Sequence, residues 1–166
     1  GLSLVTSPGM EICKNDKFVT DKVSVTELSF IDGSKITVGK DTEFIVAEYE
    51  INNDKSNLAL FELLKGAFRM VTGAITKTAH RCEVKTSLAV LGVRGTDFSG
   101  GFGLTPEGIH VVMLTGKGVY VTNRQGETVE LNADGLGTTV LANMPPKTPI
   151  KWKDEKVAKA IATITP

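Results

Sequence analysis

Short stretches of the chain alternate between apolar and polar residues, and turn-forming residues separate these stretches. Residues 23–30 read VSVTELSF and residues 42–51 read TEFIVAEYEI. A period of two is typical of β-strands with one buried face. The Asp-Gly pair within residues 31–34 supplies the positive φ that a tight hairpin requires. The pattern therefore predicts strands over 23–30, 35–39 and 42–51, with a hairpin turn at 31–34.

The same pattern continues to residue 141. Residues 58–75 have leucine spacings that fit a helix and alternations that fit strands; Gly66 and Gly73 oppose one long helix, so we predict two strands that separate near Lys65-Gly66. Residues 82–103 predict two strands around Arg94-Gly95. Residues 108–141 predict four strands. We interpret SGGFG (99–103) as a mobile surface loop, because it lacks the Gly-Lys-Ser/Thr ending of a phosphate loop.

Turn signals recur about every ten residues, which is typical of an all-β sandwich, barrel or solenoid. Residues 28–38 and 119–131 share a weakly similar hairpin pattern, as expected of stacked β layers. The sequence therefore predicts an all-β fold of stacked antiparallel hairpins, either solenoid-like or a twisted β-sandwich, with a short C-terminal helix. We divide it into a β domain over 1–143 and a Pro-rich connector with a capping helix over 144–166.

The C-terminal segment differs from the rest in composition. Residues 144–152 contain three of the six prolines, which favours an extended connector over a sheet strand. Asp154 is a candidate N-cap, and Val157, Ala160, Ile161 and Ile164 share one helical face. We expect this helix to dock on its own domain; docking on a partner is the alternative.

Charge excludes one class of function. The 166 residues contain 19 Lys and Arg and 19 Asp and Glu, so the formal net charge is zero. Nucleic-acid binding depends on a basic patch, so we expect no nucleic-acid partner. No apolar run reaches the roughly 20 residues of a membrane span. The chain begins at Gly1 with no leader-like stretch, and we expect a trimmed sequence that lacks its leader or anchor.

The cysteines and histidines form no recognisable cofactor or metal motif. Cys13 and Cys82 have no metal-site spacing, and we expect no metal and no cofactor. His80 lies two residues before Cys82, but two strand residues lack the nucleophile–base–orienter arrangement of a catalytic thiol. A Cys13–Cys82 disulfide is an open alternative if the protein is exported.

Residues 86–98, TSLAVLGVRGTDF, resemble the signature of FecR-domain proteins. The matching residues are Thr86, Ala89, Gly92, Arg94, Gly95, Thr96 and Phe98. The earlier Asp32, Gly33 and Ser34 are similar to another family pattern, and the likeness extends over about 10–141. Ser87 stands where the family usually has proline. The resemblance implies an all-β domain of the bacterial cell envelope, periplasmic or otherwise exported, without the membrane and anti-sigma segments of full regulators.

Arg94 supports two interpretations. In the first, it is a partly buried tether that binds an acceptor such as Asp97 or Asp32, while Thr96 bonds to the turn and Phe98 fills the core. In the second, Arg94, Thr96 and Asp97 line a polar pocket for an anionic or sugar-like ligand. We favour the tether, because interior polar groups are usually structural.

The function expected from these observations is non-enzymatic. We expect an exported FecR-like domain that acts in binding, signalling or scaffolding through contacts with another envelope protein or a surface polymer. The loops near 99–107, a sheet face or an open edge would make the contact. The alternative is a small-molecule or glycan-binding module with a pocket near Arg94. The sequence shows no convincing catalytic set, so an enzyme is the third and least favoured hypothesis.

Overall fold

A computed structural model describes residues 3–51, 57–73 and 80–166 of the chain, with the His80 side chain excluded. Its strands confirm the predicted all-β class. They are β1 (Asp16–Val19), β2 (Thr26–Ser29), β3 (Lys35–Val38), β4 (Glu43–Glu50), β5 (Asn57–Lys65), β6 (Ala67–Val71), β7 (His80–Lys85), β8 (Ala89–Phe102), β9 (Ile109–Asn123), β10 (Thr128–Leu131), β11 (Leu136–Val140) and β12 (Ile150–Lys151). One helix, α1 (Asp154–Ala162), follows β12.

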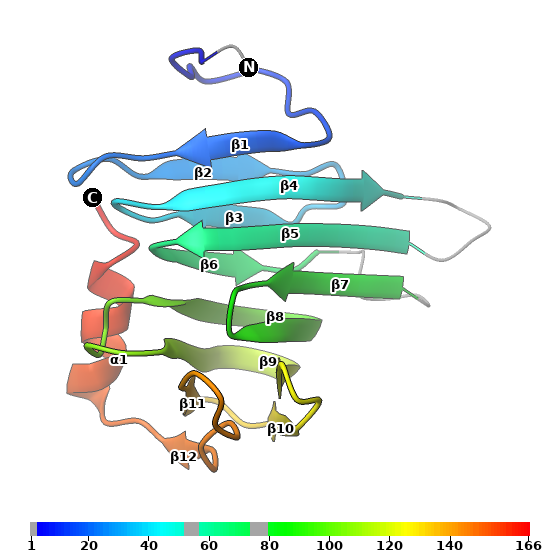
Figure 1. Cartoon of the computed structure of the whole chain (residues 1–166). Coiled ribbons are helices and arrows are strands. Elements are labelled where there is room, and N and C mark those ends of the chain that lie inside the picture. The colour runs from blue at the N-terminus through cyan, green and yellow to red at the C-terminus, as the bar shows by residue number, and fades with distance from the viewer. Residues whose placement is uncertain (1–2, 52–56, 74–79) are drawn as a thin grey trace.

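The strands form one sheet that folds over into two layers (Figure 1). Its order is β1-β4-β5-β7-β8-β6-β3-β2, and β9, β10, β11 and β12 continue it beyond β8. The first half of β8 pairs with β7, whereas the second half pairs with β6. Strand β8 therefore passes from one layer into the other, and the result is a twisted sandwich with solenoid-like winding.

Two connections depart from the predicted antiparallel hairpins. Strands β5 and β7 are parallel, with Leu58 opposite Arg81. Strands β5 and β6 do separate at Gly66, as predicted, but they pair with different neighbours. Gly66 has a φ of +83°, and a Cβ there would lie 2.1 Å from the Thr42 hydroxyl oxygen. Gly66 therefore turns the chain from one layer into the other.

Aromatic rings fill the space between the layers. Phe44 of β4 stacks on Phe61 at 5.7 Å between ring centroids and lies 5.7 Å from Phe68 of β6. Phe68 in turn meets Phe98 of β8 edge-on at 5.5 Å. Phe98 is fully buried, as predicted for this residue.

The C-terminal helix packs against its own domain. Ala160 is buried, and Val157 packs on a small core cluster with Val112 and Trp152. The C-terminal end of the helix reaches the β3–β4 connection, where the Lys40 N–H donates to the Thr163 carbonyl at 3.1 Å. The predicted N-cap was one residue late: Lys153 is the cap and Asp154 begins the helix. The connector also contains the short strand β12, which was predicted to be absent.

Candidate functional site

The predicted Arg-Gly-Thr bend is the corner at which β8 changes layers. Gly95 has a φ of +47°, and Gly116 on β9 has a φ of +131°. A Cβ on Gly116 would lie 2.5 Å from the Gly95 carbonyl oxygen. The bend does not divide two strands, however, because β8 continues through it; the division lies at residues 86–88, between β7 and β8. Both strands turn here together, which requires glycine on each.

Thr96 holds this corner together. It is 3% exposed, and its hydroxyl lies 2.9 Å from the Gly118 carbonyl and close to the Arg94 carbonyl. The same oxygen accepts the Gly118 N–H at 3.0 Å. The backbone N–H of Thr96 donates to the Thr72 hydroxyl at 2.7 Å. These contacts join β8 to β9 and to the chain after β6, as expected for a structural threonine.

Thr96→Val should lower the free energy of unfolding by about 2 kcal/mol, because it leaves the buried Gly118 N–H without its acceptor. Thr96→Ser, which keeps the hydroxyl, should lose less than half of that. Arg94→Ala at the same corner should change it by under about 0.5 kcal/mol. Urea unfolding of the three variants measures this, and equal stability of Thr96→Val and wild type would contradict it.

Arg94 is not the buried tether that the sequence predicted. Its side chain is exposed, and its guanidinium carbon lies 5.1 Å from the centroid of the Tyr120 ring. Gly92 lies on the same outward side of β8, which leaves the Arg94 side chain facing solvent. Both carboxylates proposed as its acceptors bind other residues. Arg94 also lines neither of the two hollows described below.

The ion pair at this corner belongs to Arg69, which sequence reasoning missed. Arg69 of β6 donates from Nε to Asp97 Oδ1 at 2.9 Å and from Nη2 to Asp97 Oδ2 at 2.7 Å. This two-point contact with Asp97 raises the pKa of the Arg69 guanidinium. Val71 lies directly opposite Asp97, and Arg69 lies two positions before Val71 along β6. The ion pair between Arg69 and Asp97 can therefore be recognised only from the register of β6 on β8.

The Asp32-Gly33-Ser34 stretch is the predicted hairpin turn, and its polar groups bind the turn to its surroundings. Asp32 accepts the Tyr49 hydroxyl at 2.6 Å and the Ser34 hydroxyl at 2.7 Å. Ser34 Oγ accepts the Gly73 N–H at 2.8 Å. Burial, together with the bond to Asp32, raises the pKa of Tyr49. This arrangement is a structural anchor.

Thr86 closes the turn between β7 and β8. Its hydroxyl accepts the backbone N–H groups of Leu88 at 3.2 Å and Ala89 at 3.0 Å. A hollow of about 430 Å³ beside this turn is lined by Thr86, Ser87, Lys85 and Arg124, among others. The structure therefore gives Thr86 a local folding role.

The SGGFG segment is not a loop. Ser99, Gly100 and Gly101 lie within β8, are buried, and pair with both β6 and β9. A Cβ on Gly101 would lie 2.4 Å from Ala67 Cβ. These glycines allow the strands to approach closely. Glycine-rich composition alone does not distinguish such close packing from a flexible loop. Of the contact loop predicted at 99–107, only residues 103–107 remain outside the strand.

The Cys13–Cys82 disulfide, left open from the sequence, is not formed. Cys13 is exposed and Cys82 is buried, and both are free thiols. Burial raises the pKa of the Cys82 thiol to about 12, so it remains protonated at neutral pH. His80 belongs to β7 by its backbone, but its side chain lies outside the described residues.

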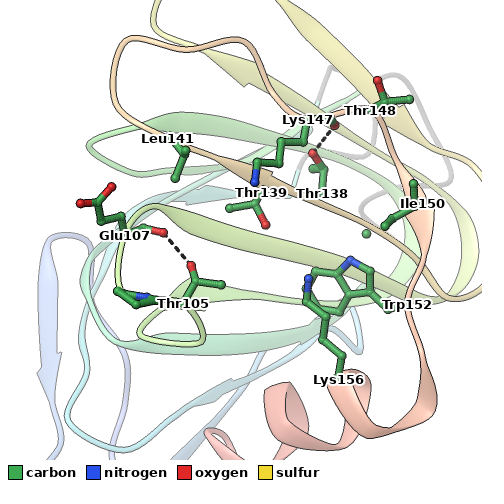
Figure 2. Close-up of a pocket in the computed structure, with 12 residues that line it drawn as sticks. Thr105, Glu107, Thr138, Thr139, Leu141, Lys147, Thr148, Ile150, Trp152 and Lys156 are labelled. Atoms are coloured by element: carbon green, nitrogen blue, oxygen red, sulfur yellow. Dashed lines mark hydrogen bonds between the residues drawn. The ribbon is translucent and has the colours of Figure 1, made fainter.

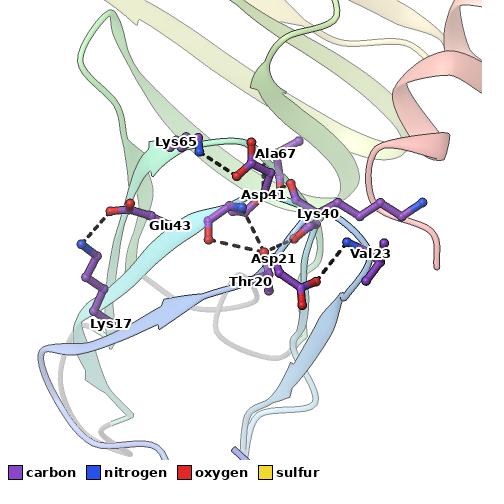
Figure 3. Close-up of polar contacts among 11 residues, drawn as sticks. Lys17, Thr20, Asp21, Val23, Lys40, Asp41, Glu43, Lys65 and Ala67 are labelled. Carbon is purple, nitrogen blue, oxygen red and sulfur yellow. Dashed lines mark hydrogen bonds and ion pairs between the residues drawn. The ribbon is translucent and has the colours of Figure 1, made fainter. Parts of the chain in front are cut away.

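Polar groups also tie the layers together near the N-terminal end of the sandwich (Figure 3). The buried Thr20 hydroxyl donates to the Gly39 carbonyl at 2.6 Å and accepts the Thr42 N–H at 2.9 Å. Around it, Lys17 pairs with Glu43 and Lys65 pairs with Asp41, each at 2.6 Å. Each lysine neutralises its carboxylate partner. The cluster is therefore a structural contact that joins the β1–β2 connection to the β3–β4 connection.

A larger hollow lies between β11, the connector and α1, and we call it the connector pocket (Figure 2). Its volume is about 490 Å³, within the range of small-molecule sites. Its walls come from three segments, the 105–107 loop, β11 and residues 147–156. The lining residues are Thr105, Pro106, Glu107, Gly137, Thr138, Thr139, Leu141, Lys147, Thr148, Ile150, Trp152 and Lys156.

Two lysines enter the connector pocket. Lys147 extends over Thr139, and Lys156 rises from α1 beside the indole of Trp152 (Figure 2). The Lys156 ammonium lies 4.0 Å from the centroid of the Trp152 ring. Burial and then the charge of Lys147 lower the pKa of Lys156. Within the described residues, neither lysine has a carboxylate within 4.0 Å.

His110 is buried beside this pocket. It is 0% exposed, and its ring centroid lies 6.1 Å from that of Trp152. Neither ring nitrogen has a hydrogen-bond partner among the described residues. Burial, with a smaller effect of Lys156, lowers the pKa of His110 to about 4. The imidazole is therefore neutral at pH 7.

The described residues contain no group of three or more His, Cys, Asp and Glu side chains placed to hold a metal ion. Across the same part of the chain, no helix has the length and apolar character needed to span a bilayer.

A comparison with protein families assigns the architecture. The model of the FecR protein family matches residues 16–117, more than half of the chain. The chain belongs to the FecR protein family. This confirms the resemblance found at residues 86–98. No curated protein matches the sequence significantly.

Solved structures share the fold. Two crystal structures of a candidate anti-sigma factor from Parabacteroides distasonis ATCC 8503, at 2.50 Å and 1.65 Å resolution, superpose with a TM-score of 0.67 at 17% sequence identity. They cover 86% of this FecR-family chain. The chain spans 62% and 63% of the respective neighbours.

Proposed function

We propose that this FecR-family chain is a non-enzymatic, exported domain that recognises another protein of the bacterial cell envelope and takes part in signalling. Membership of the FecR family and the fold shared with crystal structures of a candidate anti-sigma factor support a signalling role exerted through a protein partner. The structural observation that carries the proposal is an open end of the sandwich.

At this open end, β1 pairs only with β4 and β2 pairs only with β3, within the described residues (Figure 1). Apolar side chains are exposed here: Val19, the last residue of β1, is 67% exposed, and Val23, in the connection to β2, is 76% exposed. Residues 3–11 are exposed and form no strand that would close the end. Unpaired edges beside apolar side chains are suited to pairing with a strand of another protein.

A cross-linked pull-down from the source envelope fraction tests this proposal. Wild type should capture one envelope protein, and a Val19→Lys, Val23→Lys double variant should capture at least tenfold less of it, because lysines on an edge oppose strand addition. Met144→Lys changes an equally apolar residue, 52% exposed, in the connector and should capture as well as wild type.

Circular dichroism must first show that both variants are folded. Undiminished capture by the double variant would contradict the open end as the binding surface. Loss of capture in Met144→Lys alone would place the contact at the connector instead.

A further inference from the structure

The connector pocket carries a concentration of positive charge that the fold itself does not use. Lys147 and Lys156 come from different segments, the connector and α1, and both line the same hollow. Burial and then the charge of Lys147 lower the pKa of Lys156, so the ammonium of Lys147 disfavours the charged form of Lys156. A structural lysine would be expected to pair with a carboxylate, and neither of these does among the described residues.

The pocket is held in place by backbone contacts. The Lys147 N–H donates to the Thr139 carbonyl at 3.0 Å, and the Thr138 hydroxyl donates to the Lys147 carbonyl at 2.5 Å. The Trp152 N–H donates to the Gly135 carbonyl at 2.9 Å. The connector is therefore fixed along β11 before any ligand arrives, so the ligand need not order it.

Hydroxyl groups complete the set of donors. Thr139 and Thr148 line the pocket, and no bond to a described residue uses either hydroxyl. Threonine hydroxyls and ammonium groups all donate hydrogen bonds, as the oxygens of a carboxylate or phosphate require.

The surroundings select against a sugar stacked on the tryptophan. One contact of the Trp152 ring is the Lys156 ammonium at 4.0 Å. Gly137 lies so close that a Cβ there would be 2.3 Å from the indole. Both contacts occupy ring surface that a sugar would need, so the lysines are the recognising groups. The only acidic side chain in the lining, Glu107, is exposed, as are Lys147 and Thr148; Lys156 is half-buried and Thr139 is buried.

We propose that the connector pocket binds a small molecule through a carboxylate or phosphate group, held between Lys147 and Lys156 with the Thr139 and Thr148 hydroxyls as further donors. This site lies away from the open end and from Arg94. The family model ends at residue 117, whereas both lysines follow it. The lysines and threonines that would hold the ligand therefore lie beyond the family match, whereas the 105–107 wall of the pocket lies within it.

The single tryptophan of the chain makes the test direct, because Trp152 lines the pocket. The full chain is titrated with sodium phosphate and, separately, with sodium acetate at constant ionic strength, and the indole N–H resonance is followed by NMR. Wild type should show a saturable shift with at least one of the two anions. The anion that binds more tightly distinguishes a phosphate from a carboxylate ligand.

Lys147→Met and Lys156→Met should each weaken this binding about tenfold, the loss expected for one charge-assisted hydrogen bond. Lys159→Met, on the exposed side of the same helix, is the matched control and should bind as wild type does. A shift with sodium chloride of equal size overturns the proposal. So does the absence of saturation with both anions, or unchanged binding in both pocket variants.

Discussion

Phe68→Ala should lower the free energy of unfolding by about 4 kcal/mol and the melting temperature by about 10 °C. Phe68 is fully buried, and its ring joins Phe44 of one layer to Phe98 at the crossing strand β8. Removing the ring creates a cavity between the layers that neighbouring strands, fixed by their hydrogen bonds, cannot close.

Leu64→Ala is the control for this measurement. Leu64 belongs to the adjacent β5 but is 50% exposed, so its loss should cost under about 1 kcal/mol. Urea unfolding measures the free energy of unfolding of both variants, and calorimetry measures their melting temperatures. The m-value should be the same as in the wild type. A Phe68→Ala loss no larger than that of Leu64→Ala would show that the two layers do not depend on this aromatic bridge.

The strands could be predicted because their side chains alternate between the buried core and the exposed surface. The hairpin of β2 and β3 follows from alternation and from the Asp-Gly turn, both of which are local. The family signature likewise located the corner at Gly95. Local pattern therefore identified the all-β class and the place of the motif.

Pairing between distant strands could not be predicted in the same way. The parallel contact of β5 with β7 depends on the winding of the whole chain. Asp97 was likewise assigned to Arg94, whereas it binds Arg69. Spacing along β8 does not show which side chain of β6 lies beside Asp97. The connector pocket joins Lys147, Lys156 and β11 by tertiary docking, and no local motif marks it.

The close packing of β8 against β6 at Gly101 can be tested by a single substitution. Gly101→Ala should cost about 3 kcal/mol, at the upper end of the range for overpacking. The new Cβ would lie 2.4 Å from Ala67 Cβ and 2.6 Å from Ala67 Cα, and part of this contact is backbone that pairs with β8. The neighbouring strand would have to move away.

Gly92→Ala, in the same strand, is the matched control. Its Cβ would meet only Tyr120 Cβ, at 3.8 Å, and its backbone does not have the positive φ that favours glycine. We expect a change within about 0.5 kcal/mol, although Gly92 is part of the family signature and Gly101 is not. Chemical denaturation compares the two. If Gly101→Ala were as stable as Gly92→Ala, residues 99–103 would be the loose segment that their composition suggests. The opposite order shows that steric room, rather than membership of the signature, decides where β8 requires glycine.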